Sequence, residues 1–382
     1  MEWKEVRLGD VCTRVCSGGT PKSTNLSYYG GEIPWLNTKE IDFNRIYSTE
    51  KTITDSGLNN SSAKWIAPNT VTVAMYGATA GKSCIVKVPM TTNQACCNLT
   101  INDEVADYEF VYYTLKNDYT TLASLANGGA QQNLNAQIIK DYVLKMPSLA
   151  DQRRIASILS SLDRKIELNN KINADLEEMA QAIFKNWFVD FEPFKDGKFV
   201  DSELGMIPEG WKVVKMGDFF PVKTGKKDAN TASVNGKYPF FSCSQNALCT
   251  DSYSFDCDAI LVAGNGDFNV KWYSGKFDAY QRTYVLIPYN KKLLALLYYV
   301  VKRNLLTITS KARGSVIRFI TKGNLTDFEF AIPRDLENNE IVDVFESINE
   351  KIFANNKENS RLSLLRDTLL PRLMSGELEV PE

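Results

Sequence analysis

The sequence lacks histidine altogether, although it has 382 residues. This absence excludes Ser-His-Asp and Cys-His catalysis and every metal site that needs imidazole ligands. The eight cysteines form no CxxC pair, so a zinc site would need four scattered thiolates, and small buried thiols are the simpler interpretation. A metal site made of carboxylates alone stays open, but no convincing acidic cluster stands out. We therefore expect no metal and no cofactor.

A long hydrophobic run is missing as well. The longest, residues 293–301, is flanked by lysines and an arginine and is far shorter than the roughly 20 residues of a membrane-spanning helix. A related stretch around Tyr112 and Tyr113 resembles the one around Tyr298 and Tyr299, which predicts a buried amphipathic helix in each of two modules. No signal peptide is visible, so we expect a cytoplasmic protein with reduced cysteines.

Charge is nearly balanced over the whole chain but not locally. The net charge of −2 argues against a general polyanion binder. Residues 197–333 nevertheless carry 18 basic and 12 acidic residues, while residues 151–196 and 334–382 together carry 13 basic and 20 acidic residues. This distribution is compatible with DNA contact by the globular parts and protein contact by the acidic segments, whose charged faces could also simply be solvated.

What the sequence does contain is an internal repeat. The segment beginning at Asp141 matches the segment beginning at Asp327 without a gap. The stretches in front of them also begin alike, with WKEVRLGDV at 3–11 and WKVVKMGDF at 211–219. Two similar modules in one chain suit a ligand with two half-sites, and duplex DNA is the obvious one.

Each repeat ends in a predicted long helix. Apolar residues and asparagines recur there at spacings of three and four, which is typical of a coiled coil, and we expect the two helices to pack antiparallel. The stripe residues used for this prediction are Leu159, Leu162, Ile166, Asn169, Asn173, Leu176, Phe345, Ile348, Ile352, Asn355, Asn359 and Leu362. The asparagines either fix the register of the pair or mark a loosened, hydrated stretch. About 37 residues would form a rod of roughly 55 Å.

These patterns predict an α+β fold with two similar mixed α/β domains, separated by a pair of long antiparallel helices and related by an internal pseudo-two-fold. The expected boundaries are 1–149 for the first domain and 150–190 for the first helix. A linker and the second domain follow at 191–333, then the second helix and tail at 334–376. Each helix follows a proline and an acidic first turn, and Pro193 would block continuation of the first.

Residues 71–88 predict two strands around a tight glycine turn. The GATAGKS segment at 77–83 resembles a phosphate loop only superficially, because three residues instead of four separate its glycines and no helix follows. It either presents Thr79 and Lys82 to a DNA backbone or is a purely structural turn. No Asn-Pro-Pro-aromatic tetrapeptide occurs, so the chain has nothing to hold a flipped adenine for methylation.

Several motifs together resemble the specificity subunit of type I restriction–modification systems. They are GGTPKS at 18–23, IPWLNTKEI at 33–41, MYGATAGKS at 75–83, Asn93–Gln94, the segment 131–155 and IPEGW at 207–211. The resemblance covers essentially the whole chain in the family's order. The second module departs from it by lacking a clear GATxGK, for which VAGNGDF at 262–268 is the apparent counterpart.

The resemblance implies a non-catalytic DNA reader with two target recognition domains. Its partners would be double-stranded DNA, two methyltransferase subunits that use S-adenosylmethionine, and ATP-dependent restriction subunits. The rival hypotheses are a stand-alone DNA methyltransferase or nuclease, and a scaffold for partner proteins that does not itself read DNA.

Reading a base edge requires a polar side chain on a loop that can form two hydrogen bonds to it. Arginine suits guanine in this role, and asparagine or glutamine suits adenine. The candidates in the first module are Thr20, Lys22, Asn37, Lys39, Thr79, Lys82, Asn93, Gln94, Gln131, Gln132 and Asn133. Those in the second are Lys226, Lys227, Ser244, Gln245, Asn246, Asn265, Gln281, Arg282, Arg313 and Arg318. Each could instead be a solvated loop residue, and Gln94 and Gln281 could be shared structural residues. The densest cationic spot is ARGSVIR at 312–318.

Overall fold

The computed structural model describes residues 2–126, 133–234, 236–310, 312–314 and 316–380. The chain divides into two compact units, each of which contains one β-rich module and parts of both long helices. Unit 1 comprises residues 1–168 and 358–382, and unit 2 comprises residues 169–357. The division into units therefore falls inside the helices, while the boundaries expected from the sequence lie at the helix ends.

Unit 1 begins with strand β1 (Lys4–Arg7), which pairs antiparallel with β11 (Val143–Met146) just before the first long helix. Its main sheet has the order β2-β10-β7-β8-β4. These strands span Cys12–Ser17, Cys96–Ile101, Val71–Ala74, Ser83–Val86 and Arg45–Ile46. The helices α2 (Tyr108–Asn117), α3 (Tyr119–Leu125) and α4 (Ala136–Asp141) complete the core, in which Tyr112 and Tyr113 of α2 are fully buried.

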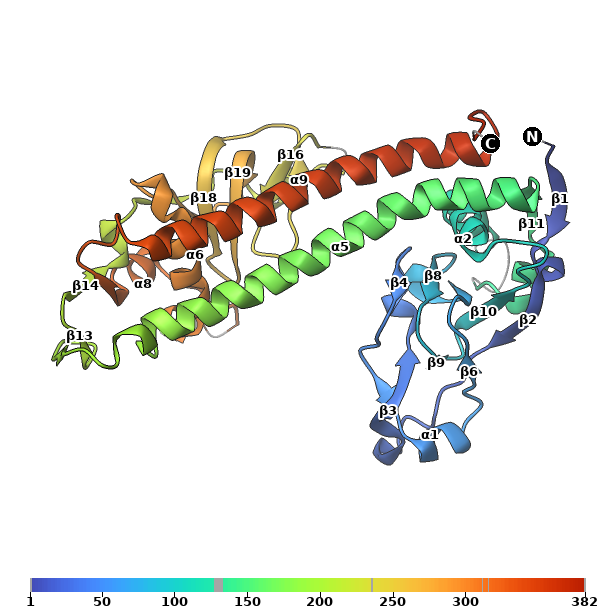
Figure 1. Ribbon diagram of the computed structural model, residues 1–382, viewed down its shortest axis with the longest axis horizontal. Coiled ribbons are helices and arrows are strands. Elements are labelled where there is room, and N and C mark those ends of the chain that lie inside the picture. Colours follow the sequence, from blue (N-terminus) through green and yellow to red (C-terminus); the bar gives the residue numbers. More distant parts are fainter. Residues whose placement is uncertain (1, 127–132, 235, 311, 315, 381–382) are drawn as a thin grey trace. The chain divides into compact units, whose positions relative to one another are not determined.

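Unit 1 has a second, smaller sheet, for which the described residues of unit 2 contain no counterpart. Its order is β5-β3-β9-β6, and its strands span Thr52–Ile53, Tyr29–Leu36, Met90–Thr92 and Trp65–Ile66. The short helix α1 (Asp55–Asn59) is capped at its N-terminus by Thr54, whose hydroxyl accepts a hydrogen bond from the Gly57 amide. This sheet is visible around β3, β9 and β6 in Figure 1.

Unit 2 repeats the arrangement of a two-stranded pair, a main sheet and following helices seen in unit 1, which is called the frame below. Strand β14 (Trp211–Lys215) pairs antiparallel with β21 (Glu329–Pro333), and the main sheet has the order β15-β20-β18-β19-β16-β17. These strands span Val222–Thr224, Thr283–Leu286, Phe255–Ala263, Val270–Ala279, Tyr238–Phe241 and Leu248–Thr250. The helices α6 (Leu294–Arg303), α7 (Leu305–Ser310) and α8 (Lys322–Thr326) follow. A hairpin of β12 (Phe199–Val200) and β13 (Ile207–Pro208) precedes the module.

The two frames correspond strand by strand. The order β2-β10-β7-β8 in unit 1 becomes β15-β20-β18-β19 in unit 2, and in each unit the next strand pairs parallel with the fourth. The buried helices α2 and α6 occupy the same place in this order, as the sequence predicted. The predicted mixed α/β fold, built twice and followed each time by a long helix, is confirmed.

The predicted strand–turn–strand at residues 71–88 is also confirmed. β7 and β8 pair antiparallel, and the turn between them contains Gly77 and Gly81 at φ values of +78° and +85°, where a side chain would be strained. In unit 2 the turn between β18 and β19 occupies the same place and contains Gly266 at φ +68°. Topology thus identifies the VAGNGDF segment as the counterpart of GATAGKS.

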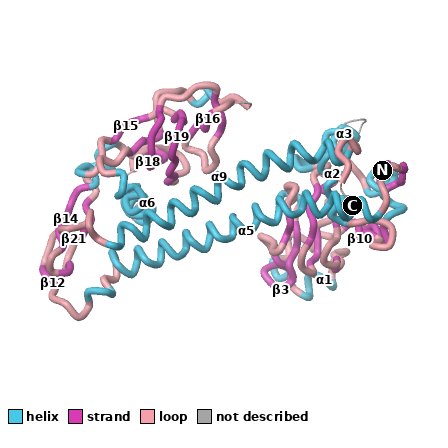
Figure 2. The backbone as a smooth tube through the Cα atoms, turned by 45° about the horizontal axis from the view of Figure 1, so that its top comes forward, coloured by secondary structure: helices cyan, strands magenta, loops and turns pink. Residues whose placement is uncertain are grey.

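The long helices are α5 (Leu149–Phe188) and α9 (Glu340–Met374), drawn in Figures 1 and 2. α5 begins close behind Pro147, as expected, and ends before Pro193. α9 begins later than the repeat predicts, because residues 334–339 form turns and the Asn339 side chain accepts a hydrogen bond from the Ile341 amide (3.0 Å), which caps the helix there.

Within each unit the two helices pack antiparallel. In unit 1 Asp163 meets Arg366 and Lys165 meets Glu358, and in unit 2 Asn173 meets Asn355 while Phe184 meets Phe345. All twelve predicted stripe residues are buried or half-buried. The Asn355 amide donates to Asn173 Oδ1 (2.8 Å), and the Asn173 amide donates to Asn356 Oδ1 (2.9 Å). A polar pair that must meet across the helices favours one register over its neighbours.

No helix among the described residues is long and apolar enough to cross a membrane. The described residues also contain no group of three or more metal-ligating side chains. The eight cysteines, all of which lie in the described part of the chain, form no disulfide. Burial raises the pKa of the Cys12 and Cys97 thiols to about 12, so these thiols stay protonated at neutral pH.

Candidate nucleic-acid interface

In unit 1 the polar candidates gather where strands β3, β7 and β9 end. Asn37 and Lys39 lie on the loop after β3, and the Thr79 hydroxyl of the glycine turn donates to the Thr38 carbonyl on that loop (2.9 Å). The Asn93 amide, after β9, donates to the Leu36 carbonyl (2.9 Å). The fold thus brings together three loops that are distant from one another in the sequence.

Thr20 and Lys22 lie on the loop between β2 and β3, next to this group. The Trp35 indole donates to the Gly19 carbonyl (2.9 Å), which fixes the loop against β3. Thr20 and Asn37 both line a cavity of about 540 Å³, whose other wall includes Glu50. Asn133 is exposed and lies beside the end of β7, because the amide of the next residue, Leu134, donates to the Met75 carbonyl (3.0 Å). Gln131 and Gln132 lie outside the described residues.

Most charge in this group is already paired within the unit. Lys39 forms an ion pair with Glu50, and Lys82 Nζ lies 2.6 Å from Asp42 Oδ1. Hydrogen bonding to Glu50 raises the pKa of Lys39, so it stays charged. A lysine that already has an acidic neighbour contributes less to phosphate attraction than a lysine without one. Asn37 serves as a helix cap, since its side chain accepts from the Lys39 amide.

Asn93 and Gln94 differ although they are adjacent. Asn93 is buried, and its Oδ1 accepts from the Ala95 amide (3.1 Å), so it shapes the turn into β10. Gln94 is exposed at the same turn. Gln94 therefore offers an accessible side chain for base contact, and Asn93 would act mainly through the backbone it holds.

In unit 2 the candidates gather around the turn between β19 and β20. The Gln281 amide donates to the Lys227 carbonyl (2.9 Å), and the Gly264 amide, beside Asn265, donates to the Arg282 carbonyl (2.8 Å). Gln245 donates to Asp267 Oδ2 (2.6 Å) across to the β18–β19 turn. Five segments contribute to this loop cluster: 226–228, 242–246, 264–269, 280–283 and 313–319, the last without Ser315, which lies outside the described residues. All ten candidates of unit 2 lie on these segments.

The side chains of this loop cluster are more accessible than those of unit 1. Lys226, Ser244, Gln245, Asn246, Gln281, Arg282, Arg313 and Arg318 are exposed, whereas Lys227 and Asn265 are half-buried. Lys271, which the sequence analysis missed, also belongs here, because its ammonium donates to the Ser244 carbonyl (2.7 Å). Burial lowers the pKa of Lys271, and an adjacent phosphate would restore it. Lys271 lies in strand β19 in the sequence, and its contacts with Ser244 and with Asn269 are what place it in the cluster.

Arg313 and Phe319 pair with each other and form the base of a short hairpin, in which Ser315 lies outside the described residues. The Arg313 and Phe319 amides each donate to the other residue's carbonyl, both at 2.8 Å, and Gly314 makes the turn at φ +103°. The Gly266 amide donates to the Arg318 carbonyl (3.1 Å), and the Ile320 amide donates to the Gly264 carbonyl (2.9 Å). The hairpin is therefore fixed to the β18–β19 turn.

A second group of polar residues, missed in the sequence, lies against the helices. In unit 1 the Tyr113 hydroxyl donates to Asp163 Oδ2 and Arg366 Nη1 donates to Asp163 Oδ1, both at 2.6 Å. Arg45 donates to Glu109 (3.2 Å) and Glu167 (3.0 Å). Burial, followed by the charge of Asp163, raises the pKa of Tyr113. This buried ionic cluster ties β4, α2, α5 and α9 together.

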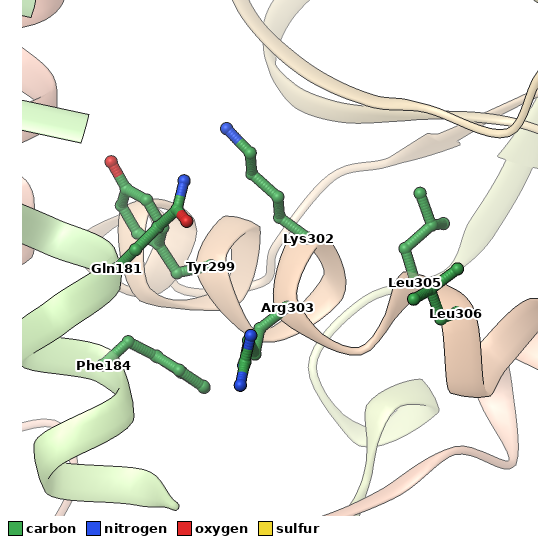
Figure 3. Close-up of a pocket in the computed structure, with 7 residues that line it drawn as sticks. All are labelled: Gln181, Phe184, Tyr299, Lys302, Arg303, Leu305 and Leu306. Atoms are coloured by element: carbon green, nitrogen blue, oxygen red, sulfur yellow. The ribbon is translucent and has the colours of Figure 1, made fainter. Parts of the chain in front are cut away.

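In unit 2 the corresponding contacts use different residues. The Tyr299 hydroxyl and the Lys302 ammonium donate to Glu177 of α5, at 3.1 and 2.5 Å. Figure 3 shows the adjacent cavity of about 300 Å³, with Gln181 and Phe184 of α5 on one wall and residues of α6 and α7 on the other. Phe184, Leu305 and Leu306 supply apolar surface, and Lys302 and Arg303 supply charge.

The comparisons with known proteins agree with this geometry. Residues 1–178 and 208–364 match the family model described as "Type I restriction modification DNA specificity domain". The chain belongs to this family and is a specificity subunit of a type I restriction–modification system. The sequence resemblance noted above is thereby confirmed.

Individual relatives carry the same description. The type I restriction enzyme MjaIX specificity subunit of Methanocaldococcus jannaschii is 29% identical over all of this chain and 94% of its own length. The EcoDI specificity subunit of Escherichia coli is 38% identical over 46% of this chain and 40% of its own length. The crystal structure of an S subunit from M. genitalium has the same fold, with a TM-score of 0.64 at 16% identity over 98% of this chain and 96% of that one.

Proposed function

We propose that this specificity subunit recognises a DNA target of two half-sites, one read by the loops of each unit. The observation that carries the proposal is the gathering of polar candidates in the same place of two equivalent frames: around the ends of β3, β7 and β9 in unit 1 and in the loop cluster of unit 2. Asparagine, glutamine and arginine on such loops suit base edges, and the lysines suit phosphates.

We further propose that α5 and α9 set the length of an unread gap between the half-sites and dock two methyltransferase subunits in the cytoplasm. Antiparallel pairing within each unit supports a fixed register of the helices. ATP-dependent restriction subunits would join the larger complex. The transfer of a methyl group from S-adenosylmethionine would belong to the partners, because the sequence lacks the Asn-Pro-Pro-aromatic motif for holding a flipped adenine.

Methylation mapping tests this proposal directly. A genome that carries this chain with its methyltransferase partners should show one methylated motif, made of two short blocks with a gap of constant length. The chain alone, incubated with DNA and labelled S-adenosylmethionine, should transfer nothing. Transfer by the chain alone would favour an enzyme, and the absence of any selected sequence with partners present would favour a scaffold.

A further inference from the structure

Two apolar side chains of the hairpin with the Arg313–Phe319 base are exposed to solvent. Val316 is 94% exposed and Ile317 is 58% exposed, whereas most aliphatic side chains of unit 2 are buried in its two cores. Leaving such side chains in water forgoes roughly 1.5–3 kcal/mol of burial energy for each. An exposed apolar pair at the tip of a loop therefore suggests a binding partner.

The base of this hairpin is held in place by backbone hydrogen bonds. Two backbone hydrogen bonds between Arg313 and Phe319 close its base, and two more fix it to the β18–β19 turn. A β-carbon on Gly314 would lie 2.2 Å from the Ile317 carbonyl oxygen, so the turn requires glycine. A hairpin whose base is already fixed loses less conformational entropy on binding a partner than an unattached loop would.

The surroundings of the tip favour DNA over protein as that partner. Arginines at 313 and 318 flank it, and Arg318 is braced by a hydrogen bond from its guanidinium to the Thr309 carbonyl (3.1 Å). The hairpin adjoins Asn265 and, through the β18–β19 turn, Arg282. Two side chains cover far less than the roughly 800 Å² that each partner contributes to a standard protein interface. Apolar residues between cations instead match the wedges that DNA-bending proteins insert between base pairs.

We propose that Val316 and Ile317 form a wedge that inserts at a base step beside the half-site read by unit 2, while Arg313 and Arg318 hold the flanking phosphates. The inference rests on the proposed function and adds a mechanical role to it. It also predicts a difference between the half-sites. In the alignment of the repeats, the equivalent positions of the first module are Ala130 and Gln131, which lie outside the described residues and have no comparable apolar pair in sequence.

The test uses the chain with its methyltransferase partners and duplexes of the mapped target, with 2-aminopurine placed at successive steps in and around both half-sites. Wild type should give a fluorescence rise at one step beside the half-site of unit 2. The double variant Val316→Ser/Ile317→Ser should lose this rise and bind about tenfold more weakly with an unchanged salt slope, because no charge is removed. Val234→Ser is the matched control, since Val234 is 97% exposed elsewhere in the same unit, and it should behave as wild type.

Other outcomes separate the two proposals. If wild type binds its target but neither unstacks a base nor responds to the double substitution, the wedge is wrong and the proposed function stands. If wild type selects no sequence, the proposed function fails and the wedge fails with it. If the double variant binds DNA normally but no longer captures a partner subunit, the tip is a protein contact and the wedge is overturned.

Discussion

Unit 1 and unit 2 share a frame but stabilise it differently. In unit 1 the side chain of Asp163 on α5 accepts from Tyr113 and Arg366. Its equivalent on α9 is Asn349, which is only 5% exposed and has no hydrogen-bond partner among the described residues of unit 2. The equivalent of Arg366 is Ala180, so the cation that would meet this position is missing. Repeats of one ancestral pattern thus keep the backbone while exchanging the interior polar contacts.

The same contrast holds on the loops. Unit 1 adds the sheet β5-β3-β9-β6 and neutralises Lys39 and Lys82 with acidic neighbours. Unit 2 extends its main sheet with β16 and β17 and leaves Arg282 and Arg313 exposed without a described ion pair. Two different loop sets on one frame are what independent recognition of two half-sites requires, because the frame can stay constant while the contacts change.

The largest effect should come from Asp163→Leu. The substitution leaves the buried guanidinium of Arg45 and that of Arg366 without a shared carboxylate, and should lower the free energy of unfolding of unit 1 by about 3–5 kcal/mol. Hydrogen exchange measured on α2 and on α6 reports the two units separately. Protection should fall on α2, and the exposed control Asp175→Leu should change neither helix. Equal loss on α2 and α6 would contradict the assignment of this cluster to unit 1.

A smaller effect, on the affinity for DNA, should distinguish the loops of unit 2 from those of unit 1. Arg313→Ala should weaken DNA binding several-fold and reduce the slope of log affinity against log salt by about 0.9, since one phosphate contact is lost. Lys82→Ala should change that slope by less than about half as much, because Asp42 already neutralises Lys82. Binding titrations at several salt concentrations measure both. An unchanged slope for Arg313→Ala would remove this arginine from the interface, and a Lys276→Ala variant controls for a general loss of charge.

The smallest expected change has the opposite sign from the first. Asn349→Leu replaces an amide that has no described partner with an apolar side chain of similar size, and should raise the stability of unit 2 by about 1 kcal/mol. The free energy of unfolding of unit 2 is measured by hydrogen exchange on α6 at increasing denaturant concentrations. If Asn349→Leu instead destabilises unit 2 as much as Asp163→Leu destabilises unit 1, both positions stabilise their units equally. The contrast drawn between the two units would then be wrong.

The polar loops were predictable as sets but not as contacts. Clusters of Gly, Asn and Gln between β-branched runs mark loops locally, which is why the sequence alone predicts that Asn37, Asn265 and Arg282 lie on loops. Their roles depend on neighbours far away in sequence. Asn93 is buried at a turn, and Lys271 enters the cluster through Ser244. The repeat also did not predict the late start of α9, because the first copy has no capping residue that corresponds to Asn339.

The sequence by itself determined the duplication, the two strand-rich modules, the paired helices and the absence of histidine. Those features rest on residue type and on short periodic spacings, which are written locally in the chain. Only the tertiary structure decided which charges are neutralised, which asparagines meet, and that Arg45, Glu109, Asp163 and Arg366 share one buried cluster. Such contacts join residues that are far apart in the chain, and their energies depend on burial and on distances of a few ångströms, which no local pattern encodes.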